Sequence, residues 1–240
     1  MAAIAPAPDV TFSKRTLPFP TEDILILPMA DDDLLSAAET AGWSFGYEDN
    51  PFTNFTSPEP IRPRNDDDHR IAQAKSASRF KEMVSGPDAN LNMVMKIVQK
   101  GEEHKVLGAA FWGLPGERHK DLDKSKLEVE KLEAWSDIHE KNWNTLMNTF
   151  QAAKDEILKE QAAKCLYLKI LFIHTDYQSA GLGKRLLQHG FDYADKFRIP
   201  VCLESSKAGR PVYERMGFKV EKMIKVEGAD LDSPFMVRWA

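Results

Sequence analysis

Residues 173–194, IHTDYQSAGLGKRLLQHGFDYA, decide the fold of this chain. A short apolar strand ends in a glutamine and two closely spaced glycines, and an amphipathic helix follows. Gly181 and Gly183 leave main-chain N–H groups free at the positive end of the helix dipole, which is the usual seat of a phosphate. The stretch therefore predicts a phosphate-binding turn, unless the glycines serve only to bend the connection between strand and helix.

Two known phosphate loops can be compared with this turn. A P-loop requires a glycine where the chain has Gln178, and Ser or Thr where it has Arg185, so the turn departs from that pattern twice. The dinucleotide pattern G-x-G-x-x-G is matched by both glycines, but Leu186 takes the place of the third. Glu204 stands near the distance of the ribose-binding carboxylate, yet too little chain follows to complete a doubly wound sheet. The dinucleotide pattern stays an alternative only.

A third pattern uses more residues. Residues 178–183 have the form Q-x-x-G-x-G, and the later stretch PVCLESSKAGRPVYERMGFK contains a strand, a loop of small residues and the ending YERMGF. In this order and spacing, over residues 166–219, the two stretches resemble motifs A and B of the GNAT superfamily of N-acetyltransferases. The version LESSKAGRPVYERMGF is similar to that of fungal and related small GNAT proteins.

The rest of the chain predicts an α/β fold with a mixed central sheet flanked by helices. Strands are expected at residues 23–30, 90–99, 104–114, 165–174, 199–205, 218–228 and 233–240. Helices are expected at 34–43 (capped by Asp33), at 66–84, at 206–216 and in the stretch after the two glycines that ends at Ala194. Residues 50–65 are expected to form a long loop, and the charged residues 117–164 an inserted helical pair. The resemblance implies the GNAT fold, with parallel strands splayed to admit acetyl-CoA. We expect a loose leader at 1–20 and a single GNAT domain at 21–240.

Composition limits the partners. The formal charge of −5 and the pI near 5.7 disfavour nucleic acid, and no apolar run approaches the roughly 20 residues of a membrane span. Cys165 and Cys202 lie in apolar runs, which is typical of buried thiols in a reducing compartment. The N-terminus lacks the basic and apolar regions of a secretory signal. We therefore expect a cytoplasmic protein without nucleic-acid or membrane partners.

The resemblance implies acetyl-CoA as cosubstrate and no metal. The loop main chain would wrap the pyrophosphate through Gln178, Ser179, Ala180, Gly181, Leu182, Gly183 and Lys184. Main-chain groups of Leu171, Phe172 and Ile173 would pair with the pantetheine amides like an added strand. Ser206 stands where many members have an Asn that contacts the cofactor. Ser179 stands where they often have a basic residue, so some positive charge is missing or comes from Lys184 and Arg185.

The resemblance also implies catalytic residues. Tyr213 matches the family tyrosine that protonates the departing thiolate, and a phenol with a pKa of about 10 stays protonated at neutral pH. Lys169 stands where relatives often carry a Glu or His base, and a lysine is a poor base. Tyr167, His174 and Glu204 remain. Glu204, at the end of a strand beside the expected wedge, is the first choice, and a water relay is the alternative.

The acceptor site is expected around residues 43–55, WSFGYEDNPFTNF, where the GNAT fold places its acceptor-binding helix and loop. Trp43 and Phe45, with Glu48 and Asp49, suit an amine through apolar contact, cation–π attraction and charge, unless the two rings only cap the core. Trp239 is expected to line the same pocket from the last strand.

These expectations together describe an enzyme. It would move an acetyl group directly to a small-molecule amine within a ternary complex, because neither cysteine presents itself as an acetyl carrier. A protein lysine or N-terminal amine as acceptor, and an acyl-CoA-binding module with weak or no catalysis, are the alternatives. Residues 117–164 would cover the acceptor side or form the surface of a homodimer.

Overall fold

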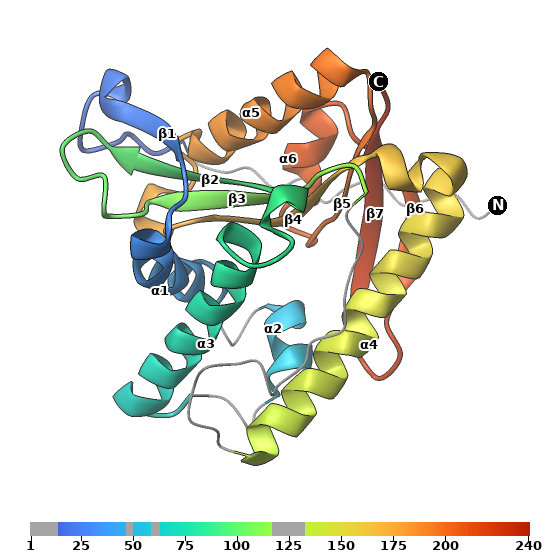
Figure 1. Ribbon diagram of the computed structural model, residues 1–240, viewed down its shortest axis with the longest axis horizontal. Coiled ribbons are helices and arrows are strands. Elements are labelled where there is room, and N and C mark those ends of the chain that lie inside the picture. Colours follow the sequence, from blue (N-terminus) through green and yellow to red (C-terminus); the bar gives the residue numbers. More distant parts are fainter. Residues whose placement is uncertain (1–13, 47–49, 59–62, 117–132) are drawn as a thin grey trace.

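The computed structural model describes residues 14–46, 50–58, 63–116 and 133–240, and Figure 1 shows its arrangement. The strands are β1 (Ile24–Pro28), β2 (Asn92–Gln99), β3 (Gly108–Gly113), β4 (Leu166–Ile173), β5 (Val201–Glu204), β6 (Lys219–Lys225) and β7 (Asp232–Arg238). The α-helices are α1 (Leu34–Phe45), α2 (Pro51–Thr56), α3 (Asp66–Val84), α4 (Glu133–Leu158), α5 (Leu182–Phe197) and α6 (Arg210–Arg215). Short 3₁₀ helices lie at Thr21–Asp23, Asp31–Asp33, Ala89–Leu91, Lys159–Lys164 and Thr175–Tyr177. The mixed α/β architecture, a central sheet flanked by helices, confirms the predicted fold class.

The described strands form one seven-stranded sheet in the order β1-β2-β3-β4-β5-β7-β6. Neighbouring strands are antiparallel except for β4 and β5, which run parallel at the centre. This parallel pair is joined by α5, which crosses from the end of β4 back to the start of β5. The central position of the pair places the loop before α5 in the middle of one edge of the sheet.

Helices cover both faces of the sheet (Figure 1). On one face, the apolar stripe of α5 packs on residues of β3 and β4, including Leu187 and Phe191 against Trp112 and Leu166. On the other face, α1 and α3 cover β2, β3 and the far end of β4, and α4 covers the start of β4 together with β5 and β7. Because both faces are covered, the strands around β4 are largely apolar.

The contact between α5 and β3 is unusually close at Gly190. A Cβ atom there would lie 2.3 Å from Cζ2 of the Trp112 ring, which is itself fully buried. Glycine at this position therefore sets how near α5 lies to the sheet, and with it the position of the loop that begins the helix.

The prediction of a long loop at residues 50–65 is wrong for six residues, because Pro51–Thr56 form the helix α2. Asn50 caps this short helix, since its Oδ1 accepts from the N–H of Phe52 at 3.0 Å, and proline occupies the first helical position. The Phe52 ring lies 5.8 Å from that of Phe150 on α4. Local capping and a tertiary contact together outweigh the loop-like composition.

Asp33 does not cap α1 with its side chain, contrary to expectation. Its Oδ2 accepts from the N–H of Ala30, and its Oδ1 lies 2.5 Å from Lys96 Nζ in a buried ion pair. The carboxylate therefore ties the start of α1 to β2 rather than capping the helix.

The predicted helical pair at residues 117–164 corresponds, within the part that the structure describes, to the single helix α4 and the 3₁₀ helix after it. Residues 117–132 lie outside the described residues. The inner side of α4 includes Leu146, Phe150 and Ala153, which pack on the sheet. The helix is therefore a structural cover of β5 and β7.

A loose leader was expected at residues 1–20. Residues 14–20 are instead packed on the protein, and residues 1–13 lie outside the described residues. Leu17 and Phe19 pack against the main core, and the Phe19 ring lies 6.0 Å from that of Tyr177. This segment runs along the loop that precedes α5.

Candidate functional site

The two central strands separate soon after they begin. Within β4 and β5 the parallel register joins only two pairs, Leu166 with Val201 and Tyr167 with Cys202. The register of β4 with β3 shifts at this point, because Phe111 pairs with Ile170 and Trp112 with Leu168, which leaves Lys169 as the extra residue of a bulge. A bulge bends its strand and increases its twist, so β4 turns away from β5 beyond Leu168. The result is the predicted splay, a wedge between the two strands.

Strand geometry decides which main-chain groups of β4 face this wedge. The N–H of His174 donates to the carbonyl of Leu107 at 2.8 Å, on the β3 side. Because N–H groups point alternately to the two sides of a strand, those of Leu171 and Ile173 point to the β5 side and that of Phe172 points to β3. The Phe172 side chain is buried among α1 and α3. The pairing role expected of three consecutive residues is therefore open to Leu171 and Ile173, and not to Phe172.

The Q-x-x-G-x-G loop lies at the open end of the wedge and leads into α5. Ser179 and Gly181 have φ angles of +63° and +86°, so the chain turns sharply and Gly181 takes the left-handed conformation that glycine adopts without cost. In the described part of the chain, none of the N–H groups from Gln178 to Lys184 donates to a protein acceptor. The loop and the first turn of α5 therefore present a row of free donors.

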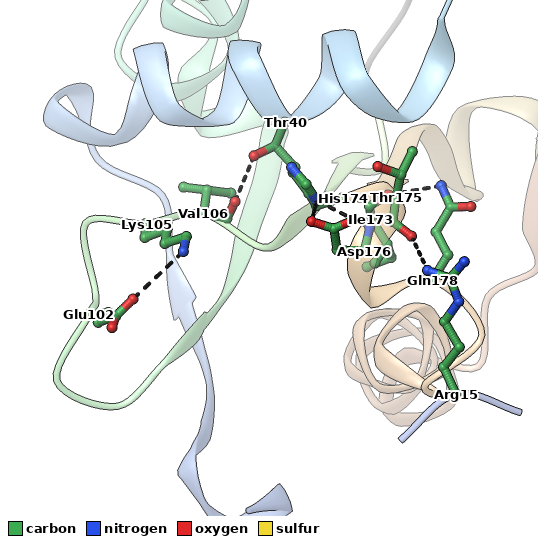
Figure 2. A network of polar contacts seen from close by, with 10 residues as sticks. All are labelled: Arg15, Thr40, Glu102, Lys105, Val106, Ile173, His174, Thr175, Asp176 and Gln178. Carbon is green, nitrogen blue, oxygen red and sulfur yellow. Dashed lines mark hydrogen bonds and ion pairs between the residues drawn. The ribbon is translucent and has the colours of Figure 1, made fainter. Parts of the chain in front are cut away.

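The side chains of the loop differ in their burial and in their contacts. Gln178 Nε2 donates to the Ile173 carbonyl at 3.0 Å, as Figure 2 shows, which folds the loop back onto β4. Leu182 is buried in the core, so only its main chain faces the loop opening, whereas Ser179 and Lys184 are exposed. A Cβ on Gly183 would meet nothing closer than Ile173 Cγ1 at 3.8 Å. Among the described residues, no side chain therefore crowds the Cβ positions of Gly181 and Gly183.

Tyr213 lies beyond the end of β5, on α6. Its ring packs edge-on against Phe218 at 5.7 Å, and a Cβ on Gly209 would lie 3.1 Å from its Cε2. Burial raises the pKa of Tyr213 above its ordinary value, so the phenol stays protonated at neutral pH. Its hydroxyl makes no hydrogen bond with the residues that the structure describes. It is a free proton donor beside the loop that leaves β5.

Ser206 is part of the turn that begins α6. Its Oγ accepts from the N–H of Gly209 at 3.1 Å, and its carbonyl accepts from Ser205 Oγ at 2.8 Å. The side chain is exposed but already serves this turn. A contact of Ser206 with a cofactor would have to share or replace that bond.

Glu204 ends β5 where the two strands part, on the face covered by α4. The Tyr167 hydroxyl donates to Glu204 Oε2 at 2.5 Å, and the Lys154 ammonium of α4 lies 4.8 Å from the centre of the Tyr167 ring. Glu204 Oε1 is shielded from solvent and accepts no hydrogen bond within the described residues. Burial raises the pKa of Glu204 to about 7, against the lowering effects of Tyr167 and Lys154. The carboxylate is thus poised to take up a proton near neutral pH.

The other candidate bases have different surroundings. Lys169 sits in the β4 bulge, and its Nζ donates to Asn92 Oδ1 at 3.2 Å. His174 lies in the loop after β4, where its Nδ1 accepts from the N–H of Asp176 at 3.2 Å and its ring lies near those of Trp43 and Tyr177. Of the candidates, Tyr167 and Glu204 are brought together and the other two are not. The role of Lys154 was missed, because nothing in a charged helix marks which lysine is buried.

The three aromatic residues expected to bind the acceptor do not share one place. Trp43 faces His174, and Phe45 packs edge-on against Phe172, both near the open end of β4. Trp239 follows Arg238, which pairs with Val201 at the opposite end of β5, and its Nε1 donates to Glu221 Oε1 at 2.8 Å. The expected common pocket therefore does not include Trp239. Glu48 and Asp49 lie outside the described residues.

A cavity of about 720 Å³ lies between α2, α4 and the turn from β6 to β7. Asn54, Asn142, Glu227 and Asp230 are among its polar lining residues. Neither Tyr167, Glu204 nor Tyr213 lines it, so it is separate from the candidate reacting groups.

Two further searches concern metals and membranes. Across residues 14–46, 50–58, 63–116 and 133–240, no group of three or more His, Cys, Asp or Glu is placed to hold a metal ion. None of the helices in these ranges combines the length and apolar character that crossing a bilayer requires.

Comparison with known proteins adds the family. Residues 125–229 match the model of the acetyltransferase (GNAT) domain. An uncharacterized N-acetyltransferase of Schizosaccharomyces pombe is 26% identical over 121 residues, which cover 49% of this chain and 49% of that protein. The chain thus matches about half the length of this curated relative.

Solved structures share the fold at low sequence identity. The histone acetyltransferase HPA2 and related acetyltransferase from Corynebacterium glutamicum has a TM-score of 0.56 at 16% identity, covering 90% of this chain and 96% of that one. The arylalkylamine N-acetyltransferase 2 from Aedes aegypti has a TM-score of 0.55 at 15% identity, covering 90% and 99%. The splayed central strands and the free N–H groups before α5 thus lie in a chain that has the GNAT fold and whose residues 125–229 match the acetyltransferase (GNAT) domain.

Proposed function

We propose that this protein is an acetyl-CoA-dependent N-acetyltransferase that moves an acetyl group directly to a small-molecule amine in a ternary complex. The observation that carries the proposal is the wedge between β4 and β5, which has free N–H donors at its open end and the Tyr167–Glu204 pair at its closed end. A thioester lying in this wedge would have its phosphates at the loop and its acetyl group at the pair. The family match supports the reaction class.

The coenzyme would be held almost entirely by main chain. The N–H groups from Gln178 to Lys184 would receive the pyrophosphate, and glycine at 181 and 183 lets the phosphate oxygens approach them. Leu171 and Ile173 would pair with the pantetheine arm. Bound acetyl-CoA supplies an activated acetyl thioester. No metal takes part in this proposal.

The roles of the reacting groups are proposed from which of them can accept or donate a proton near neutral pH. Glu204 would accept the proton of the acceptor ammonium, either at Oε1 or through the Tyr167 hydroxyl, which passes its own proton to Oε2 as it takes one up. An N–H on the wedge side of β4 would polarise the thioester carbonyl. Tyr213 would give its proton to the departing thiolate, for which its raised pKa keeps it protonated. The buried thiols of Cys165 and Cys202 carry no acetyl group in this scheme.

The acceptor is proposed from charge and shape. A carboxylate whose second oxygen is shielded and unpartnered suits a primary ammonium group, and Trp43 and Phe45 add exposed rings near the open end of β4. The fold neighbours include one protein named for histones and one named for arylalkylamines, so they do not choose between protein and small-molecule acceptors. The two buried cysteines lie side by side as thiols, with Cys202 Sγ donating to Cys165 Sγ at 3.4 Å and no disulfide between them, which supports the proposal of a cytoplasmic location.

A screen with thiol-release detection tests the reaction. Purified protein and acetyl-CoA are incubated with arylalkylamines, amino acids, polyamines and lysine or N-terminal peptides, and coenzyme A binding is measured by calorimetry in parallel. Thiol release with an amine, together with the N-acetylated product by mass spectrometry, is the expected result. Binding without release for every acceptor would favour the acyl-CoA-binding module, and release with peptides alone would favour a protein acetyltransferase.

A further inference from the structure

The segment of residues 14–20 is joined to the Q-x-x-G-x-G loop by Arg15. The Arg15 N–H donates to the Ser179 carbonyl at 3.2 Å, and Arg15 Nη1 donates to the Thr175 carbonyl at 2.8 Å. Figure 2 shows the Arg15 side chain reaching the turn at Thr175, beside the Gln178 side chain. Arg15 therefore bonds both the 3₁₀ helix that precedes the loop and Ser179 within the loop, from a part of the chain some 160 residues away.

These bonds divide the polar groups of the loop into two sets. The carbonyls of Ile173, Thr175, Ser179 and Gly181 all accept protein donors, from Gln178, Arg15, Arg15 and Arg185 in turn. The N–H groups from Gln178 to Lys184 have no protein acceptor among the described residues. Within the loop, the Ser179 carbonyl is thus held by the N-terminal segment and the Gly181 carbonyl by α5, on the side away from the N–H groups.

Ser179 is the residue whose conformation most needs such support. Its φ of +63° is in the left-handed region, which is costly for a residue with a side chain. The bond from the Arg15 N–H to its carbonyl fixes the peptide plane that also carries the N–H of Ala180. The bond from the Arg15 side chain to the Thr175 carbonyl keeps the Arg15 main chain in place for this contact. Without the side chain that peptide plane is free to rotate, and the Ala180 donor would leave the row.

The segment that carries Arg15 is itself anchored. Leu17 and Phe19 pack against the core, Phe19 contacts Tyr177, and Arg185 Nη1 donates to the Thr21 carbonyl at 3.4 Å. Arg15 is exposed and approaches the loop from the side of its carbonyls, so it need not touch a ligand at the N–H groups.

We propose that Arg15 is a positioning residue for coenzyme A: it clamps the carbonyl side of the loop so that the N–H groups stay aligned for the pyrophosphate. The inference rests on the proposed binding of coenzyme A at this loop.

The test compares Arg15→Met with Lys14→Met, because both variants remove one positive charge from adjacent exposed residues, and of the two only Arg15 has a contact with the loop. Calorimetric titration measures Kd for coenzyme A, for dephospho-coenzyme A and for pantetheine, which lacks the pyrophosphate. The rate is measured as KM for acetyl-CoA and kcat at saturation. Arg15→Lys, which keeps a donor and the main chain, tests rescue.

We expect Arg15→Met to weaken coenzyme A and dephospho-coenzyme A equally, by about three- to tenfold as for the loss of one such hydrogen bond. Pantetheine affinity and kcat stay unchanged, Lys14→Met resembles the wild type, and Arg15→Lys recovers part of the loss. Equal Kd values for Arg15→Met and Lys14→Met would overturn the inference. A loss confined to coenzyme A would also overturn it, because Arg15 would then bind the 3′-phosphate directly. If the wild type binds no coenzyme A, the proposed function itself fails.

Discussion

The Tyr167 hydroxyl lies 2.5 Å from Glu204 Oε2, across the two parallel strands at the point where they part. Tyr167 belongs to the last paired position of β4, and Glu204 lies two residues beyond its partner Cys202, on the same face of β5. The hydrogen bond therefore spans the closed end of the wedge. It leaves Oε1 of the carboxylate shielded from solvent and without a hydrogen bond from the described residues.

The pH profile of acetyl transfer should follow Glu204. If the ionised carboxylate is the base, the rate rises with pH through a value near its pKa of about 7 and then levels. The Tyr167 hydrogen bond lowers that pKa, so in Tyr167→Phe the rising limb moves to higher pH. The measurement is kcat/KM from pH 5.5 to 9 with one fixed acceptor. Tyr193→Phe, on the other face of the sheet, is the control and should keep the wild-type profile.

Lys154, on α4, should also influence the pH at which the rate of acetyl transfer rises. It is buried on α4, and its charge lowers the pKa of Glu204. Lys154→Met keeps most of the side-chain volume and removes the charge. We therefore expect the pKa of Glu204 to increase, and the rise of kcat/KM to move to higher pH, as in Tyr167→Phe. Lys164→Met, at an exposed lysine after the same helix, should leave the profile unchanged. A Lys154→Met profile that coincides with the wild type would contradict the link between α4 and the base.

The free energy of unfolding should also depend on the ionisation of Glu204, but it should fall as the pH rises, whereas the rate increases. Because burial raises the folded-state pKa of Glu204, its favourable contribution is fully present below the ordinary value near 4.5 and is lost as pH rises through about 7. Glu204→Gln keeps an acceptor for Tyr167 and removes the ionisation. Between pH 5 and pH 8, the free energy of unfolding of the variant should gain on that of the wild type by up to about 3 kcal/mol. Urea unfolding at both values measures this, and parallel pH dependences would refute it.

Tyr213→Phe should slow the chemical step without weakening the coenzyme. The hydroxyl is the only group removed, and it makes no hydrogen bond with the described residues, so the ring packing and the fold are kept. We expect kcat to fall by about 10²- to 10⁴-fold, the usual contribution of a general acid, with Kd for coenzyme A unchanged. An unchanged kcat at saturating acetyl-CoA would remove Tyr213 from its proposed role.

Much of this fold could be predicted because its signals are local. The expected bounds of α3, Asp66–Val84, match the structure, since capping residues and the Gly86–Pro87 pair mark its ends. The loop before α5 and the strands on either side follow from two motifs within about fifty residues of sequence. The helix α2 was missed because six residues rich in Pro and Thr depend on packing against α4, which the sequence does not display.

The parts of the site that could not be predicted depend on distant contacts. Glu204 was the first choice for the base, but its bond to Tyr167 and its approach to Lys154 join three elements. The contact of Arg15 with Thr175 spans nearly the whole chain, and an Ala- and Pro-rich start gives no sign of it. Trp239 was expected at the acceptor pocket because it ends the last strand. Only the antiparallel register shows that this strand ends beside Val201, away from the wedge.

The two glycines of the loop should separate folding from coenzyme binding. Gly181 has a φ of +86° and open space around its Cβ position, so Gly181→Ala should cost about 1 kcal/mol of stability through the backbone alone. The conformation of Gly183 is helical, and its Cβ would meet only Ile173 Cγ1 at 3.8 Å, so Gly183→Ala should fold as well as the wild type. Both variants should bind coenzyme A at least tenfold more weakly, since a methyl group would stand before the N–H donors. Thermal unfolding with and without coenzyme A measures both effects. Wild-type affinity in Gly183→Ala would mean that the phosphates lie elsewhere, because the variant leaves every protein contact of the loop in place.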